Sequence, residues 1–245
     1  QPQGALPAAA APFLWPHAPV LLLAAALALL AWWRAARSRD LRRLGLVVGV
    51  LVGISANAWA TGGLSKPHLR YEARILWLMP VIARAEAPAR RRRLPPGLRR
   101  ALPVVAILLG AAMLAWPAAL NGYPLVFIDT VSYLMHTTAP ELPWDKTQAY
   151  GPFLHLFHWQ WSLWPALAAQ GLIASHLIWL AQRAVRGAAG AGAHLLLCGG
   201  LAALTAAPWF LATLMPDALT ALAPLCLFLL GFGRLSRIEV AWVAA

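Results

Sequence analysis

The arginines of this chain lie in clusters, and each cluster adjoins a long apolar stretch that carries no charge. In membrane proteins, arginines close to a span are held on the cytoplasmic side, so such clusters fix the direction of the helices between them. The pattern is typical of a polytopic membrane protein and predicts an all-α transmembrane helix bundle of five to seven spans. The clusters are Arg34, Arg37, Arg39, Arg42 and Arg43; Arg84, Arg90, Arg91, Arg92, Arg93, Arg99 and Arg100; and Arg183 and Arg186.

Composition supports a membrane location. The chain is 61% hydrophobic and only 11% charged, whereas a soluble domain has roughly 25% charged residues. A net charge of +12 would ordinarily suggest a nucleic-acid partner. The distribution of arginines already explains this charge, so we expect no nucleic acid and instead membrane lipid as the partner. The abundance of Ala and Arg is associated with bacterial proteins, and we expect the inner (plasma) membrane.

Six stretches are long and apolar enough to be considered as spans, since a helix needs about 20 residues to cross a bilayer. They cover residues 13–33, 44–60, 101–120, 162–181, 193–214 and 218–233. If the arginine clusters are cytoplasmic, residues 34–43, 183–186 and 234–237 lie inside and the loop 121–161 lies outside.

The chain divides into three regions. Residues 1–84 hold two transmembrane helices and the segment 71–83, which either crosses as a short helix or lies in the interface. Residues 85–100 form a basic, Arg- and Pro-rich cytoplasmic linker, and residues 101–245 hold four transmembrane helices with the long outer loop. Because the topologies of the two halves fit poorly, we expect few contacts between residues 1–83 and 101–245. The chain starts at Gln1 and stops where apolar character resumes, so we expect a fragment.

Gly45, Gly49 and Gly53 repeat every fourth residue and place a strip of glycine on one helix face. Such a strip permits close approach of another helix. It fits either packing within the chain or dimerisation, and packing within the chain is favoured.

The loop 121–161 is much longer than a turn and is rich in aromatic residues, which favours an ordered, functional segment. Two surface helices are predicted, over residues 129–138 and 147–161. Asp129 directly follows an apolar run, and Asp217 stands at the mouth of the next outer loop. The two carboxylates are expected at similar depth, where they could bind a divalent cation or supply a general base. The alternative is that each simply caps a helix.

Other polar residues give weaker signals. His155 and His158 share a helix face, which fits a metal site with a carboxylate or, as we favour, packing among interfacial aromatics. His136 lies in the same loop. Gln170, Ser175 and His176 fall inside a predicted span, where hydrogen bonding to neighbouring helices is favoured over substrate binding.

Residues 101–233 resemble the N-terminal part of polytopic bacterial glycosyltransferases of the GT-C type. The resemblance lies in the order of an outward span, a long outer loop that opens with Phe127-Ile128-Asp129-Thr130-Val131-Ser132-Tyr133-Leu134, two surface helices and further spans. It implies that Asp129 is catalytic or a metal ligand and that Asp217 occupies a second acidic position. Thr130 stands where the family has a partner acid. Residues 57–80 resemble the closing segment of a similar membrane protein.

The resemblance implies transfer of a sugar from a polyprenyl-phosphate donor to an acceptor on the outer face. Lys146 would then neutralise the donor phosphate, and His155 and His158 would be candidate substrate-binding residues. The only cofactor suggested is a divalent cation. The alternative is a non-enzymatic multi-pass protein, either a transporter portion or an assembly subunit. A transporter would be expected to have polar residues or broken helices in mid-membrane. We expect neither feature in the stretches 101–120 and 218–233, and in 193–214 we expect only Thr205 and Pro208 to provide them.

Overall fold

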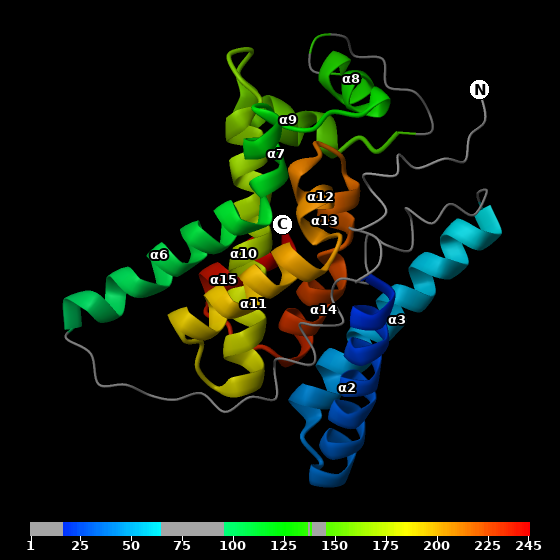
Figure 1. Ribbon diagram of the computed structural model, residues 1–245, viewed down its shortest axis with the longest axis vertical. Coiled ribbons are helices and arrows are strands. Elements are labelled where there is room, and N and C mark those ends of the chain that lie inside the picture. Colours follow the sequence, from blue (N-terminus) through cyan, green and yellow to red (C-terminus); the bar gives the residue numbers. More distant parts are fainter. Residues whose placement is uncertain (1–16, 65–95, 137, 139–145) are drawn as a thin grey trace.

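A computed structural model describes residues 17–64, 96–136, 138 and 146–245 (Figure 1). Within these ranges the regular secondary structure is helical, apart from one isolated bridge between Leu125 and Thr213. The prediction of an all-α fold is therefore confirmed for this part of the chain. The predicted segment 71–83 and most of the linker 85–100 lie outside the described residues.

Long helices alternate with short ones along the chain. The helices are α2 (His17–Ser38), α3 (Leu41–Leu64), α6 (Pro96–Leu114), α7 (Trp116–Asn121), α8 (Ile128–Met135), α9 (Tyr150–His158), α10 (Trp164–Arg186), α11 (Ala191–Leu204), α12 (Ala207–Ala212), α13 (Asp217–Thr220), α14 (Ala223–Phe232) and α15 (Arg237–Ala244). The two predicted loop helices correspond to α8 and α9, although both are shorter than expected.

Three of the predicted spans are each divided into two helices, which corrects the expectation of unbroken spans. The pairs are α6 with α7, α11 with α12, and α13 with α14. In each pair the second helix has a proline in its first turn, namely Pro117, Pro208 and Pro224. Proline lacks the N–H that would continue the preceding helix, and its ring collides with the carbonyl of the previous turn. Hydropathy averaged over a stretch of about 20 residues does not reveal such a break.

Among the described helices, α10 alone is both long enough and apolar enough to cross a membrane by length and composition. Three shorter apolar helical stretches cover Ala101–Leu114, Ala191–Leu204 and Asp217–Phe232.

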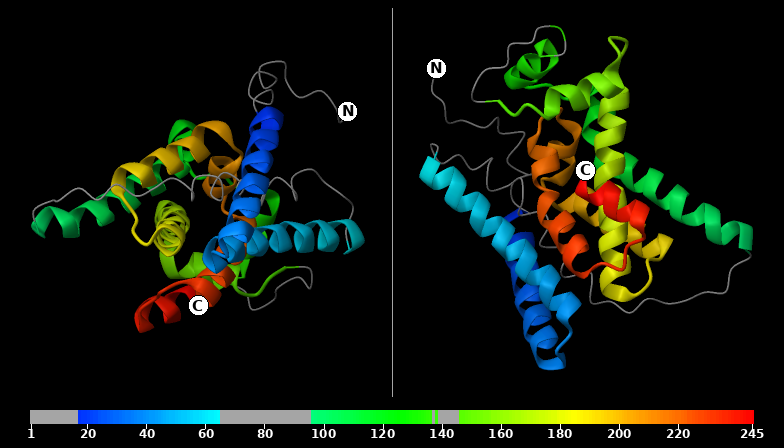
Figure 2. Two further views of the ribbon diagram at one scale, coloured as in Figure 1. Left: turned by 90° about the horizontal axis from the view of Figure 1, so that it is seen from below. Right: turned by 180° about the vertical axis from the view of Figure 1, so that it is seen from behind.

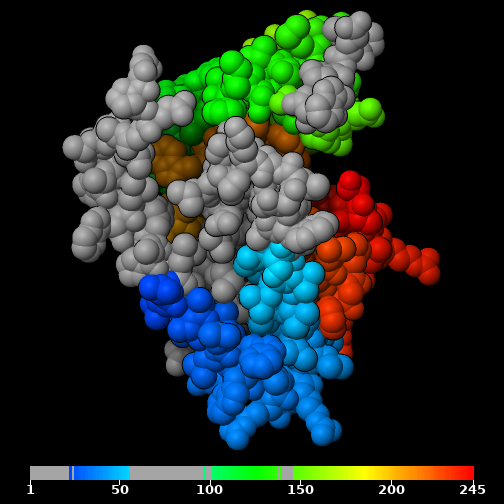
Figure 3. Space-filling view, turned by 90° about the vertical axis from the view of Figure 1, so that its right-hand side faces the viewer, coloured from blue at the N-terminus to red at the C-terminus, as the bar shows by residue number. Residues whose placement is uncertain are grey.

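Helix α10 lies at the centre of the molecule and packs against α6, α9, α11, α12 and α14 (Figures 1 and 2). Its buried residues Leu177, Ile178 and Leu180 belong to the main hydrophobic core. One end of the molecule carries α8 and α9, and we call it the loop end. The opposite end carries the α2–α3 and α10–α11 turns, and we call it the arginine end. Figure 3 shows the same two ends, with the green loop helices far from the blue α2–α3 turn.

The glycine strip of α3 packs against α14, which confirms that it serves packing within the chain. A Cβ added at Gly45 would lie 2.5 Å from Phe232 Cε2, and one added at Gly49 would lie 3.8 Å from Phe228 Cβ. One added at Gly53 would overlap the ring of Pro224. Both helices present a residue every fourth position, so the ridges of α14 fit the groove on α3.

This packing overturns the expectation of few contacts between residues 1–83 and 101–245. Helix α3 contacts both α14 and α10. The expectation was wrong because it considered only the membrane orientations that the arginine clusters imply for the two halves. A strip of small residues on α3 calls for a partner helix, and the second half of the chain supplies it.

The strip allows a matched test of stability, in which Gly53→Ala is compared with Gly49→Ala. Both substitutions gain the same helix propensity, but only the methyl group added at position 53 collides with a rigid proline ring. We expect Gly53→Ala to be less stable than Gly49→Ala by about 1–3 kcal/mol, the usual cost of overpacking. Thermal unfolding of the purified chain in mild detergent measures the difference. Equal melting temperatures would contradict the α3–α14 contact.

Candidate functional site

A short parallel pairing brings together the two segments that carry the acidic residues. Leu125 N donates to Ala212 O at 2.9 Å, and Leu214 N donates to Leu125 O at 2.9 Å. Leu125 and Thr213 thereby form a parallel bridge. Asp129 lies four residues after Leu125, and Asp217 lies four residues after Thr213. Because the paired segments run in the same direction, both carboxylates follow the bridge toward the same end of the molecule.

Thr130 fastens the start of α8 to the same segment. Its hydroxyl donates to Leu214 O at 2.9 Å and accepts from Phe127 N at 2.9 Å. Thr130 is fully buried. Thr130 is therefore a structural anchor.

The interpretation of the two aspartates as helix caps is wrong. Helix α8 has Phe127 at its cap position, and Thr130 rather than Asp129 accepts the capping hydrogen bond. Helix α13 has Pro216 at its cap position, with Asp217 as its first helical residue. Each carboxylate lies in the first turn of a helix, where the helix dipole favours negative charge.

Asp129 forms an ion pair with Lys146. Lys146 Nζ lies 2.9 Å from Asp129 Oδ1, with 15% of the lysine side chain and 29% of the aspartate side chain exposed. The structure thus joins two residues that the sequence singled out separately. The pair stays partly open to solvent, so an incoming group can reach it.

Tyr133 lies within the electrostatic reach of all three charged residues. Burial raises the pKa of the Tyr133 phenol, Lys146 opposes this effect, and the carboxylates of Asp129 and Asp217 add to the rise. The backbone of Thr147 also hydrogen-bonds to Tyr133. Asp129, Asp217 and Lys146 thus all act electrostatically on the same phenol.

Tyr150 links this place to the helix core. Its ring lies 5.2 Å from that of Tyr133 in an edge-to-face arrangement, and its hydroxyl donates to Gln170 Oε1 at 2.9 Å. Gln170 Nε2 donates in turn to Leu211 O at 3.0 Å and Thr213 O at 2.9 Å. Burial, followed by the fields of Tyr133 and Asp217, raises the pKa of Tyr150 well above its ordinary value. Gln170 therefore fixes α9 to the segment that precedes Asp217.

Asp217 also lines a pocket of about 190 Å³ at the loop end. Its walls come from Phe127 at the start of α8, from Trp209 and Phe210 of α12, and from Thr213 and Met215. The pocket is mainly apolar with an acidic group at one side, an arrangement that suits a ligand with both polar and apolar parts.

The histidines stay apart from the acidic residues. The rings of His155 and His158 lie 5.7 Å apart, and His158 Nδ1 accepts from Gln160 N at 2.8 Å. Burial and then the neighbouring His155 lower the pKa of His158. In the described part of the chain, no hydrogen bond or ion pair joins either histidine to Asp129, Asp217 or Lys146.

The described ranges contain no group of three or more His, Cys, Asp or Glu residues that could hold a metal ion. Asp129 and Asp217 are the remaining candidates for a shared cation. Because Lys146 already provides a positive charge at Asp129, a cation bound at this carboxylate would be repelled by the ammonium group.

The polar residues expected to bond within the helix bundle do so in part. Ser175 Oγ donates to Ile107 O at 2.8 Å, and Gln170 bonds as described above, whereas the ring of His176 packs at a tilt against Trp242 with ring centroids 4.6 Å apart. Sequence reasoning missed the roles of Tyr133, Tyr150 and Thr130. Nothing local to Thr130 indicated its distant partner.

Comparisons of the chain with protein-family models, with curated proteins and with solved structures found no match.

Tyr150→Phe should show how strongly the Tyr150–Gln170 link holds the loop end. Near pH 7 the variant should be less stable by about 1–3 kcal/mol, because Gln170 Oε1 loses its buried donor. The folded protein holds the Tyr150 proton more tightly than the unfolded chain, so this contribution is complete below a pH of about 10. This stabilising contribution is lost as the pH rises above the pKa that Tyr150 has in the unfolded chain.

The stability gap between wild type and Tyr150→Phe should therefore narrow between pH 8 and pH 11. Thermal unfolding at the two pH values measures the gap, and contributions from other titrating groups cancel in the comparison. A gap that is absent at pH 8, or that widens at pH 11, would contradict the buried hydrogen bond.

Proposed function

We propose that the chain is a multi-pass membrane protein, with the loop end outside and the arginine end in the cytoplasm of a bacterium. Large apolar side chains on the outer surfaces of several helices support this proposal. Leu22 of α2 is 73% exposed, Leu196 of α11 is 67% exposed and Leu227 of α14 is 70% exposed. Soluble proteins rarely expose contiguous apolar surface on this scale, whereas lipid accommodates it.

Helix length is also consistent with several spans. Helices α2, α3 and α10 contain 22, 24 and 23 residues. At about 1.5 Å per residue such helices reach or exceed the roughly 30 Å of a bilayer core. At the α11–α12 break, Thr205 Oγ1 donates to Leu201 O at 2.6 Å and accepts from Ala207 N at 3.1 Å. This satisfies backbone groups that the break exposes, as a non-helical segment inside a membrane requires.

Labelling of single cysteines tests this topology. In a protein without native cysteines, Gln148→Cys at the loop end should react with a membrane-impermeant thiol reagent in intact cells. Ala188→Cys, in the α10–α11 turn, should react only after the cells are opened, because arginine-flanked turns face the cytoplasm. Reaction at residue 188 but not at residue 148 in intact cells would contradict the proposed orientation.

We further propose that the loop end transfers a sugar from a polyprenyl-phosphate donor to an acceptor hydroxyl, as the GT-C resemblance implies. The observation that carries the proposal is the ion pair between Asp129 and Lys146. Both residues act electrostatically on Tyr133, and so does Asp217. A carboxylate that is partly solvent-accessible can accept a proton, and an adjacent lysine can attract a phosphate. Together they are the two groups that this reaction needs from the protein.

The proposed chemistry is a displacement at the anomeric carbon. The acceptor oxygen forms a bond to that carbon while the bond from the carbon to the phosphate oxygen breaks. Asp129 takes the hydroxyl proton, and polyprenyl phosphate leaves with the electron pair of the broken bond. Lys146 stabilises the charge that develops on the phosphate, for which it must turn from Asp129 as the carboxylate becomes protonated.

Asp129→Asn in the full-length protein tests the proposal, because Asn keeps the shape of the side chain but cannot act as a base. Transfer from a radiolabelled polyprenyl-phosphate sugar in isolated membranes should fall by about 10²–10⁴-fold, the usual contribution of a general base. Asp40→Asn is the matched control, since Asn caps a helix as well as Asp does and Asp40 lies at the arginine end. Undiminished transfer by Asp129→Asn would reject Asp129 as the base.

A transporter portion is the second candidate, and the broken helices favour it. The structure also has a buried polar cluster between α10 and α11, in which His194 Nε2 is 3.0 Å from Ser175 Oγ and His194 Nδ1 is 3.2 Å from Gln182 Nε2. Cys198 Sγ lies 3.5 Å from His194 Nε2. Discontinuous helices and polar residues at mid-membrane are typical of transporter substrate sites.

Access to Cys198 separates the two candidates. In a Cys226→Ala protein, a small water-soluble thiol reagent should label Cys198 if a water-filled path leads to the polar cluster. In the enzyme candidate, the fully buried Cys198 should stay unreacted until the protein unfolds.

A further inference from the structure

We propose that a pocket at the arginine end binds a phosphate group through Arg42, Arg183 and Arg234. The pocket has a volume of about 210 Å³, and Leu180, Ala184 and Leu235 form the rest of its wall with Gly187. A single water molecule needs only about 10–15 Å³ of such space. The pocket is therefore large enough for a hydrated anion or for the headgroup of a lipid.

The three arginines come from distant parts of the sequence. Arg42 lies in the first turn of α3, Arg183 lies in the last turn of α10, and Arg234 follows the end of α14. Packing of α3 on both α14 and α10 brings them together. The site therefore depends on the contact between the two halves of the chain.

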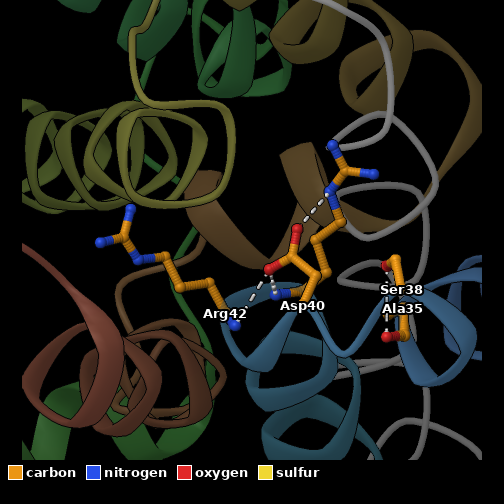
Figure 4. Close-up of polar contacts among 5 residues, drawn as sticks. Ala35, Ser38, Asp40 and Arg42 are labelled. Atoms are coloured by element: carbon orange, nitrogen blue, oxygen red, sulfur yellow. Dashed lines mark hydrogen bonds and ion pairs between the residues drawn. The ribbon is translucent and has the colours of Figure 1, made fainter.

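The acidic residue closest to Arg42 in the sequence is already engaged. Asp40 Oδ1 accepts from the backbone N–H groups of Arg42 and Arg43 at 3.2 Å each, and Asp40 Oδ2 lies 3.2 Å from Arg43 Nε. In Figure 4 the side chain of Arg42 extends away from Asp40 toward the neighbouring helices. Asp40 thus caps α3 and leaves the Arg42 guanidinium for the pocket.

Arg183 is only partly neutralised. Its Nη1 lies 2.8 Å from Glu239 Oε1, and this hydrogen bond holds the pKa of Glu239 to about 2. Its Nη2 is buried and has no hydrogen-bond partner within the described chain. A buried guanidinium nitrogen without an acceptor is costly, and a bound oxyanion would supply the acceptor.

The charge balance favours a phosphate. Three guanidinium groups line the pocket, and one of them, that of Arg183, pairs with the carboxylate of Glu239. The local excess is thus two positive charges, which a phosphate monoester with about −1.5 to −2 at pH 7 would match. The carbonyl end of α10 also faces this region, but Arg183 and Arg186 in its last turn offset that negative end.

Two sources can supply the phosphate: an anionic lipid headgroup or a soluble phosphate. The test uses the full chain purified in an uncharged detergent. In one arm, native mass spectrometry measures retention of added phosphatidic acid, with diacylglycerol as the lipid that lacks the phosphate. In the other arm, equilibrium dialysis measures binding of radiolabelled inorganic phosphate.

Arg42→Gln and Arg234→Gln should each weaken binding at least tenfold. Arg237→Gln is the matched control, because it removes the same charge from the same end but does not line the pocket. Arg42→Lys keeps the charge but loses the planar guanidinium, so its affinity for the probe should lie between those of wild type and Arg42→Gln. Circular dichroism of each variant should match that of the wild type.

The outcome of the two arms identifies the source. If the pocket variants lose binding of phosphatidic acid alone, the phosphate belongs to a lipid headgroup. If they lose binding of inorganic phosphate, the ligand is soluble. The proposal is overturned if neither probe binds, if diacylglycerol binds as well as phosphatidic acid, or if Arg237→Gln weakens binding as much as the pocket variants do.

Discussion

The pairing of Leu125 with Thr213 is the interaction on which the loop end depends. It joins the start of a long loop to the segment between α12 and α13, and side chains on both sides reinforce it. Thr130 bonds to Leu214 O on one side, and Gln170 bonds to Leu211 O and Thr213 O on the other. Two backbone and three side-chain hydrogen bonds thus hold together parts of the chain that are far apart in sequence. Asp129 and Asp217 each lie four residues beyond a residue of this pairing.

The two ends of the molecule carry different polar groups. Asp129, Lys146 and Tyr133 lie together at the loop end, while arginines from three segments line the pocket at the other end. Helix α10 connects the ends: Gln170 near its start binds the loop-end junction, and Arg183 in its last turn lines the arginine pocket. One helix therefore positions both polar regions, which differ in the groups they present to their surroundings.

Local sequence patterns predicted the features that depend on neighbouring residues. The apolar stretches indicated an all-α fold, the spacing of Gly45, Gly49 and Gly53 indicated a helix contact within the chain, and the aromatic loop indicated two short helices. Span continuity was not predictable from apolar content, because Pro117, Pro208 and Pro224 break helices without lowering that content much. The partner of the glycine strip was likewise not predictable, since it lies on α14, far along the chain.

The site was predictable only in part for the same reason. Asp129, Asp217 and Lys146 stood out by residue type and position, and all three act electrostatically on Tyr133. The Asp129–Lys146 pair and the Tyr150–Gln170 link arise from tertiary contacts that no local pattern encodes. His155 and His158 stood out only because residues three apart share a helix face. This spacing does not show which groups from the rest of the loop face them.

Disulfide trapping of the Leu125–Thr213 bridge tests the central claim most directly. In a protein without native cysteines, Leu125→Cys with Thr213→Cys should form a disulfide under mild oxidation, since bridged residues meet the Cα separation of about 4.4–6.8 Å that a disulfide needs. Leu125→Cys with Leu204→Cys, whose second site lies at the exposed end of α11, should not. A mobility shift on a non-reducing gel reports the bond. Cross-linking of the first pair alone is the predicted result. Failure of that pair to cross-link, or equal cross-linking of both pairs, would contradict the junction that brings Asp129 and Asp217 together.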